Sequence, residues 1–516
     1  MRGMGLRNEA EILISDKHSA NPPTADGIVY YNTVEKPVVI NSEEYDQVND
    51  NVFKSAKNEP LSTFSIDVDT ASYSNVRRFL NDNMMPPADA VRIEELVNYF
   101  PYDYAGPKDD RPFAVHAEIC ACPWESRHQL MRIGIKGKEM ATEELPDSNL
   151  VFLLDVSGSM SDYNKLPLLK KAFGMLVDQL GPRDRVAIVV YAGNSGVVLE
   201  STTCNARNRR KIIGALDRLN AGGSTNGGAG IQLAYNIASE NFIEDGINRV
   251  ILATDGDFNV GVTARDDLIS LIEKKAKSGV FLTVLGFGMG NYKDGTAEQL
   301  ADKGNGNYGY IDSILEAKKL LVEQRNGTLV TIAKDVKIQV EFNPAKVAGY
   351  RLIGYENRML NKEDFNDDKK DAGEIGAGHT VTALYELVPV GVKVPAGVDK
   401  LKYQTNVETE VSDAAKMSNE LLTVKLRYKA PDGAKSELIS FPVSQQDRSF
   451  TQCSEDFKFA CSVAGFGMLL RDSKYSGDLE YEDVLKMAKA GKGDDDAGYR
   501  AEFIKLVEMA EALDRE

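Results

Sequence analysis

The chain has 516 residues, with 61 Lys and Arg against 78 Asp and Glu, which gives a formal net charge of −17, and 42% of its residues are hydrophobic. This is the composition of a soluble globular protein, long enough for two to four domains. The negative surplus argues against binding to nucleic acid or to an anionic membrane surface, and no apolar run reaches the 18 residues that would predict a transmembrane segment.

The first part of the chain is predicted to contain an extension and a flanking region. Residues 1–57 are polar and interrupted by Asn21-Pro22-Pro23, so we predict a partly disordered extension with one strand at 27–31. Nothing in it resembles a signal peptide, so export cannot be read from this segment. Residues 58–147 are predicted to form an α+β flanking region, with strands at 61–69, 113–119 and 129–135 and helices at 70–80 and 90–100.

From Asn149 onward, short apolar strands alternate with amphipathic helices. This pattern is typical of a doubly wound, mostly parallel sheet buried on both faces, and we assign residues 148–327 to one α/β domain. The predicted strands are 149–155, 185–191, 249–254, 280–286 and 308–311, with an edge strand at 197–200. The predicted helices are 165–180, 207–219, 228–241, 265–278 and 314–324.

After residue 330 the pattern becomes β again and ends in helices. We predict a β-rich flanking domain over 328–448 and a helical segment over 449–516. Its strands are expected at 336–342, 351–355, 380–388 and 421–428, and its helices at 457–471, 481–490 and 499–513. Because strands lie on both sides of the α/β domain, we predict that this domain is inserted into a β-rich domain built from both flanks.

The cysteines are sparse and odd in number: Cys120, Cys122, Cys204, Cys453 and Cys461. Their spacing fits neither a disulfide framework nor a paired CxxC zinc ribbon. The sequence therefore favours buried or unpaired thiols, with a single disulfide as the alternative. It leaves the redox compartment open.

Oxygen-bearing side chains gather at the carboxyl ends of two predicted strands. One strand ends at Asp155 and continues into Ser157 and Ser159, another is followed by Asp255, and Thr225 lies in a glycine-rich loop between these segments. In open α/β sheets ligands bind at this edge, so we expect the three loops to converge. Two carboxylates and three hydroxyls, without imidazole or thiolate, suit a hard divalent cation such as Mg²⁺.

These residues resemble the metal-ion-dependent adhesion site of von Willebrand factor type A domains, in which D-x-S-x-S is joined by a distant Thr and a strand-terminal Asp-Gly. The resemblance implies that the hydroxyls of Ser157, Ser159 and Thr225 coordinate the metal. It implies that Asp155 and Asp255 act mainly through waters or hydrogen bonds to those hydroxyls. A cation with few charged ligands keeps much of its charge and leaves one position for an outside carboxylate. We expect Mg²⁺, with Mn²⁺ or Ca²⁺ as alternatives.

Segments outside the α/β domain resemble a narrower group, the bacterial von Willebrand A proteins of the YfbK type. The resemblance covers residues from about 58 to the end of the chain and rests on 64–73, Cys122-Pro123-Trp124 and 335–343. Proteins of this group are usually exported and often lipid-anchored. The resemblance therefore implies a cell-envelope location, in the periplasm or at the surface, although this chain shows neither a lipobox cysteine nor a signal.

We expect a noncatalytic protein whose α/β domain uses a bound cation to capture an Asp or Glu carboxylate of a partner protein. One alternative is a scaffold of an envelope complex, in which the metal only stabilises the fold. Another is a metal-dependent hydrolase, which is disfavoured because all four histidines lie outside residues 148–327 and no side chain is placed as a base. Residues 67–72 repeat the acid and hydroxyl pattern, so they are either a second cation site or an ordinary helix cap.

Overall fold

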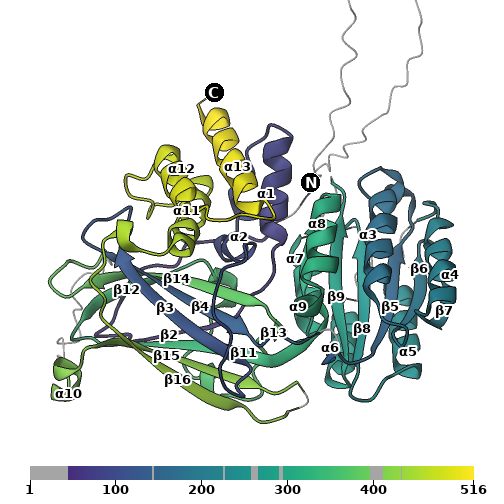
Figure 1. Cartoon of the computed structure of the whole chain (residues 1–516), viewed down its shortest axis with the longest axis horizontal. Helices are drawn as coiled ribbons and strands as arrows, with labels where there is room; N and C mark the ends of the chain where they lie inside the picture. The colour runs from purple at the N-terminus through teal and green to yellow at the C-terminus, as the bar shows by residue number, and fades with distance from the viewer. Residues whose placement is uncertain are drawn as a thin grey trace, which may run out of the picture. The chain divides into compact units, whose positions relative to one another are not determined.

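The structure is a computed structural model that describes residues 43, 45–141, 144–224, 227–256, 265–289, 294–395, 411–431 and 433–515, with only the backbone at 265 and 266 (Figure 1). The strand predicted at 27–31 lies outside the described residues. Within the described part of the chain, no helix has the length and apolar character needed to cross a membrane.

Two β-sheets combine strands from both flanks of the α/β domain. The first is antiparallel in the order β1-β12-β14-β4-β3, with bounds Lys54–Ser55, Val347–Ile353, Thr380–Pro389, Gln129–Gly137 and Phe113–Ala121. The second has the order β13-β11-β15-β16, with bounds Gly373–Gly376, Thr331–Phe342, Glu420–Lys429 and Glu437–Ser444. Strand β2 (Leu61–Ser65) also pairs with β11. The predicted strand at 61–69 was therefore too long, because its pairing with β11 ends at Ser65.

The two sheets share one apolar core. Ile133 and Tyr385 of the first sheet and Ile338 and Leu426 of the second belong to the same buried cluster. The hydroxyl of Tyr385 reaches Ser62 Oγ on β2 at 2.9 Å, which satisfies the polar tip of a buried ring. Because both flanks contribute to this core, they form one β-rich unit and the α/β domain is inserted into it, as the sequence predicts.

Five helices pack together beside the first sheet (Figure 1). Phe100, just after one of these helices, meets rings of two others edge to face: it lies 4.8 Å from Phe459 and 5.6 Å from Phe503, centroid to centroid. The helix predicted at 90–100 is shorter, since a 3₁₀ turn at Ala88–Ala90 precedes it. The helices are α1 (Ala71–Asn81), α2 (Ile93–Asn98), α11 (Glu455–Leu470), α12 (Tyr481–Ala490) and α13 (Tyr499–Asp514).

The inserted domain is a six-stranded sheet in the order β10-β9-β8-β5-β6-β7. All its pairings are parallel except that of the edge strand β7 with β6. Alternate residues of β5 enter two separate cores, Phe152 on one face and Leu153 on the other, so the sheet is buried on both faces. The strands are β5 (Ser148–Asp155), β6 (Arg185–Tyr191), β7 (Ser195–Thr203), β8 (Ile247–Thr254), β9 (Val280–Phe287) and β10 (Tyr308–Ile311).

Helices cover the two faces of this sheet. One core takes side chains of α3 (Leu166–Gln179) and α4 (Ala206–Asp217), and the other takes those of α5 (Gly227–Glu240), α6 (Arg265–Lys277) and α7 (Asp294–Lys303). The sequence did not predict α7. The single helix predicted at 314–324 is also wrong in detail: it consists of α8 (Ile314–Lys318) and a π-helical turn (Lys319–Glu323), and α9 (Arg325–Leu329) follows.

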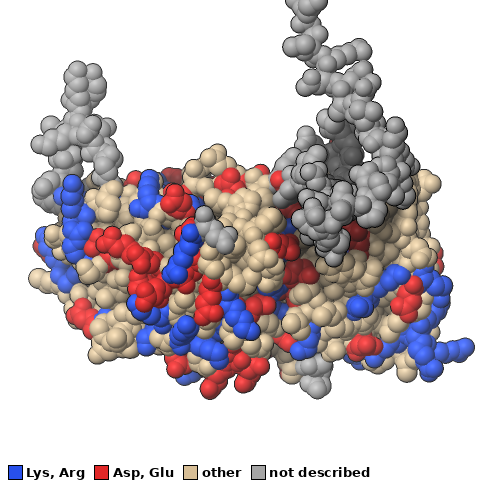
Figure 2. Space-filling model, turned by 90° about the horizontal axis from the view of Figure 1, so that it is seen from above, with Lys and Arg blue, Asp and Glu red and all other residues tan. Residues whose placement is uncertain are grey.

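The inserted domain leaves and rejoins the β-rich unit at one connector. Gly137 at the end of β4 donates its N–H to the carbonyl of His379 at 2.8 Å, and the carbonyl of Val330, just before β11, accepts the N–H of Ala377 at 2.9 Å. Both ends of the insertion are thus held by the segment between β13 and β14. On the face shown in Figure 2, acidic and basic side chains are interspersed.

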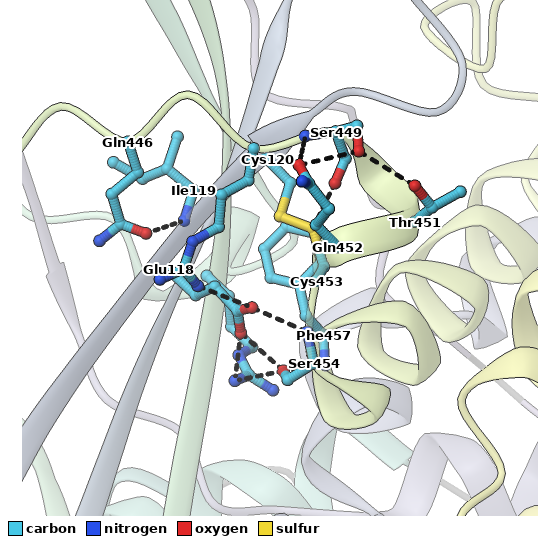
Figure 3. The surroundings of a disulfide bond; sticks show 12 residues. Glu118, Ile119, Cys120, Gln446, Ser449, Thr451, Gln452, Cys453, Ser454 and Phe457 are labelled. Carbon is cyan, nitrogen blue, oxygen red and sulfur yellow. Dashed lines mark hydrogen bonds and ion pairs between the residues drawn. A yellow bond between two sulfur atoms is a disulfide. The ribbon is translucent and has the colours of Figure 1, made fainter.

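A disulfide links β3 to the helical region (Figure 3). Cys120 and Cys453 are bonded with their Cα atoms 6.6 Å apart, within the normal range, whereas Cys122, Cys204 and Cys461 are free and buried. The preference for unpaired thiols was therefore wrong for Cys120 and Cys453. They lie 333 residues apart, so only the tertiary fold brings them together. Beside the bond, Glu118 accepts hydrogen bonds from the backbone N–H and the hydroxyl of Ser454 at 2.8 and 2.6 Å.

Replacing Cys453 by alanine is expected to lower the free energy of unfolding by about 2 kcal/mol, because the crosslink no longer restricts the unfolded chain. Chemical denaturation in oxidising buffer measures the loss. Cys204→Ala is the matched control, since it removes a buried thiol that forms no bond. Reductant should bring wild type close to Cys453→Ala and leave the effect of Cys204→Ala unchanged. A wild-type protein equally stable with and without reductant would contradict this prediction.

Candidate metal centre

Two carboxylates meet at one edge of the parallel sheet. Strand β5 ends at Asp155, β8 ends at Thr254 and is followed by Asp255, and these strands are parallel neighbours with Leu154 opposite Ala253. Parallel neighbours end at the same sheet edge, where open α/β folds bind ligands. Asp155 and Asp255 are at most 1% exposed.

The loop after β5 folds back on its own first residue. The N–H of Ser157 donates to Asp155 Oδ1 at 2.8 Å, and the hydroxyls of Ser157 and Ser159 lie 3.0 Å apart. Ser159 belongs to a 3₁₀ turn, Gly158–Ser161, which precedes α3. The D-x-S-x-S segment therefore presents its hydroxyl pair beside the Asp155 carboxylate.

The glycine-rich loop before α5 lies against this segment. Gly158 donates its N–H to the carbonyl of Gly223 at 3.0 Å, and Gly222 donates to the carbonyl of Val156 at 2.8 Å. Gly223 has a φ of +86°, a conformation that favours glycine. Thr225 lies outside the described residues, so its role as a ligand stays a prediction.

The donor set fits a hard divalent cation. Asp155 Oδ2 and Asp255 Oδ1 are both buried, and Asp255 Oδ1 has no hydrogen-bond partner among the residues that the structure describes. Burial raises the pKa of Asp155 to about 6, hydrogen bonding from Ser157 and Tyr191 opposes the rise, and the neighbouring Asp255 charge adds to it. Buried carboxylate oxygens without partners are costly unless a cation or proton satisfies them. Carboxylate and hydroxyl oxygens are the ligands that Mg²⁺, Mn²⁺ and Ca²⁺ prefer.

Sequence reasoning missed Lys165, which precedes α3. Its Nζ lies 3.0 Å from Asp255 Oδ2, and the two side chains are 7% and 0% exposed. The motif gave no signal for this residue, because a lysine at the start of a helix is usually a surface group. The contact places a positive charge directly on one of the two carboxylates.

The second acid-rich segment, 67–72, belongs to a buried ion cluster. The carboxylate oxygens of Asp67, Glu95 and Glu298 lie within 4.8 Å of one another. The guanidinium of Arg358 contacts Asp67 at 3.3 Å and Glu298 at 2.9 Å, and also binds Asp69 and Asp302. Arginine therefore supplies positive charge at this position, and the geometry favours a salt-bridge cluster over a second cation site.

This acidic cluster also joins the inserted domain to the flanking region. Arg92 on the flank binds Glu95 and Asp294 at 3.0 Å each, and it contacts Glu298 of α7. Asp69 Oδ1 accepts the N–H of Tyr308, the first residue of β10, at 2.8 Å. The segment 67–72 thus has a structural role that its motif-like spacing conceals.

Three protein families match successive parts of the chain. The von Willebrand factor type A domain family matches residues 149–323, the family described as "von Willebrand factor" matches residues 39–132, and the family described as "Uncharacterized protein YfbK, C-terminal" matches residues 327–513. Domains of the von Willebrand factor A type are usually noncatalytic adhesion modules and often bind a divalent metal ion, so a protein-interaction role is indicated.

Three similar proteins cover from 37% to 96% of the chain. The chain is 30% identical over 192 residues to "Uncharacterized protein sll0103" of Synechocystis, covering 37% of this chain and 44% of that one. A solved von Willebrand factor type A structure from Catenulispora acidiphila covers 78% of this chain and 91% of its own, at 17% identity and a TM-score of 0.42. The chain is 45% identical over 504 residues to "Uncharacterized protein YfbK" of Escherichia coli K12, covering 96% of this chain and 83% of that protein. It therefore belongs to the YfbK family of von Willebrand factor type A domain proteins.

Proposed function

We propose that this protein captures an acidic side chain of a partner protein through a divalent cation held at the edge of β5 and β8. The observation that carries the proposal is the buried carboxylate pair Asp155 and Asp255, at most 1% exposed, in which Asp255 Oδ1 has no hydrogen-bond partner among the described residues. Beside them lie the Ser157 and Ser159 hydroxyls. Thr225 is the fifth proposed ligand, from the loop that packs on Gly158.

The residues of the site would have different roles in holding the cation. Ser157 and Ser159 offer neutral hydroxyl oxygens, while Asp155 and Asp255 supply negative charge without having to be direct ligands. When bound, Mg²⁺, or Mn²⁺ or Ca²⁺ in its place, would supply a positive charge with one coordination position open to a carboxylate. The backbone hydrogen bonds between the loop after β5 and the glycine-rich loop keep the hydroxyl donors in place before any ligand arrives, which limits the ordering cost of binding.

We also propose a cell-envelope location and a partner in an envelope complex. The Cys120–Cys453 disulfide supports this location, because disulfides persist in oxidising compartments and are rare in the reducing cytosol. The family membership points the same way, through the exported location expected for proteins of the YfbK type.

Partner capture is expected to depend on both the cation and its ligands. Immobilised protein should retain its partner in 2 mM Mg²⁺ and lose it in EDTA, and Ser157→Ala should lower the bound amount at least ten-fold. Ser161→Ala is the matched control, because this exposed serine lies in the same 3₁₀ turn but outside the motif. Mass spectrometry of the eluates identifies the partner. Capture that survives both EDTA and Ser157→Ala would rule out a metal bridge.

Two further measurements separate the alternatives. A fold-stabilising metal in a scaffold protein would raise the melting temperature without any Mg²⁺-dependent partner. A metal-dependent hydrolase would release phosphate from a generic phosphate ester in the presence of Mg²⁺, and Ser157→Ala would abolish that release.

A further inference from the structure

We propose that Lys165 is a built-in counter-charge of the cation site, which makes the loaded site selective for an anionic ligand at the expense of metal affinity. The inference rests on the proposed function, since it assigns a specificity-determining role at the same site. Its basis is the buried contact between Lys165 Nζ and Asp255 Oδ2 at 3.0 Å.

The contact uses only one oxygen of the carboxylate. Lys165 binds Asp255 Oδ2, whereas Asp255 Oδ1 has no hydrogen-bond partner within the described part of the chain. The ammonium therefore leaves Oδ1 for a cation or its water, and both positive charges can be accommodated on the same carboxylate. A lysine that only filled the metal position would instead be expected to contact Asp155 as well, yet among the described residues the carboxylate that Lys165 Nζ binds is that of Asp255 alone.

The surrounding fold holds Lys165 in this position. The N–H of Lys165 donates to the carbonyl of Asp162 at 3.0 Å, which fixes the backbone just before α3. Its aliphatic stem crosses Gly288, which follows β9: a Cβ at Gly288 would lie 2.2 Å from Lys165 Cε. Gly288 has a φ of +79° and no side chain, so its conformation and its size both make room for the lysine. The charge is thus placed by packing, and it is not a mobile surface group.

The net charge of the site explains the role of Lys165. Asp155 and Asp255 contribute −2, so a divalent cation alone would bring the buried site to zero, and an incoming carboxylate would then leave it at −1. With Lys165 the loaded site carries +1, and one carboxylate returns it to zero. Because Asp155, Asp255 and Lys165 are buried, an excess charge at the site is costly, so Lys165 favours a ligand with a single negative charge. Because the same positive charge also repels the cation, the site binds metal more weakly than the two carboxylates would without the lysine.

The test uses Mn²⁺ alone as a probe of metal affinity and acetate as a probe of the open position. Lys165→Met keeps the stem and removes the charge, whereas Lys165→Arg keeps the charge. Lys165→Met is expected to bind Mn²⁺ at least ten-fold more tightly than wild type in calorimetry, and Lys165→Arg should remain within about three-fold of wild type. In water-proton relaxation of the Mn²⁺-loaded proteins, acetate should displace bound water at least three-fold less readily from Lys165→Met.

Each outcome decides the inference separately from the proposed function. Equal or weaker Mn²⁺ binding by Lys165→Met, with wild type binding Mn²⁺ normally, would overturn the role of Lys165 and leave the metal site standing. If wild type binds no Mn²⁺ but Lys165→Met does, the lysine charge is confirmed and the proposed function fails. If neither protein binds Mn²⁺, both are overturned. Because a packing role alone would not tighten metal binding, opposite effects on metal and acetate identify the charge.

Discussion

Replacing Arg358 by methionine is expected to destabilise the protein by about 4 kcal/mol. The Arg358 side chain is 11% exposed and contacts four carboxylates. Methionine fills a similar volume but leaves the acids of the flank and of α7 facing one another without this positive charge. Removing one partner of a buried ion cluster costs far more than removing a surface pair, because the remaining charges stay desolvated.

Urea denaturation of Arg358→Met at pH 7 measures this loss. The matched control is Arg111→Met, since Arg111 pairs with Asp109 at the surface, where the two side chains are 46% and 50% exposed. This control should change the free energy of unfolding far less than Arg358→Met does, because solvent screens a surface ion pair. If the two variants were equally stable, the cluster around Arg358 would not hold the inserted domain to the flank.

Replacing Glu94 by glutamine is expected to stabilise the protein at pH 8 by about 3 kcal/mol and to have little effect at pH 5. Glu94 lies at the start of α2 and is 2% exposed, and its Oε2 has no hydrogen-bond partner among the described residues. Burial raises the pKa of Glu94 to about 8, and the charges of Glu356 and Asp67 add to the rise. Glutamine is neutral at every pH, so it avoids the cost of a buried charge.

The sign of the pH dependence follows from this raised pKa. Below the usual value of about 4.5 the carboxyl is protonated in both the folded and the unfolded chain, so it does not change stability with pH. Between about pH 4.5 and 8 the folded chain holds a proton that the unfolded chain has lost, so stability falls as pH rises. Thermal melting across this range should show a shallower decline in Glu94→Gln than in wild type. The exposed Glu363→Gln is the control, and its profile should follow wild type.

The inserted domain was the most predictable part of the fold. Strands β6 and β10 have the predicted bounds. Parallel strands that are buried on both faces appear in the sequence as unbroken apolar runs between turns, so their ends are easy to locate. Helix α7 was missed because it contains Gly295 and buries few apolar side chains, such as Ala297 and Leu300, beside the charged Asp294 and Glu298. Strand β16 was missed for a related reason: it is an edge strand, largely exposed, with a proline in its middle.

The candidate site was predicted from a motif, and the parts that no motif encodes were not predicted. Asp155, Ser157 and Ser159 are close in sequence, and their pattern indicated Asp255 and Thr225 through the family resemblance. The Lys165–Asp255 pair and the Cys120–Cys453 bond join residues 90 and 333 positions apart, and only the folded chain brings them together. Charge partners at such separations leave no periodic signal in one sequence, so the structure was needed to find them.

The nested arrangement of the chain has a consequence for its synthesis. Strand β4 ends at Gly137, but its partner β14 begins only at Thr380, so β4 leaves the ribosome well before the strand that completes its sheet. At roughly 5–20 residues per second the interval is on the order of 10–50 s, long enough for the inserted domain to fold first. During that interval the nascent β3–β4 hairpin exposes an unpaired edge, which makes it a natural client for chaperones.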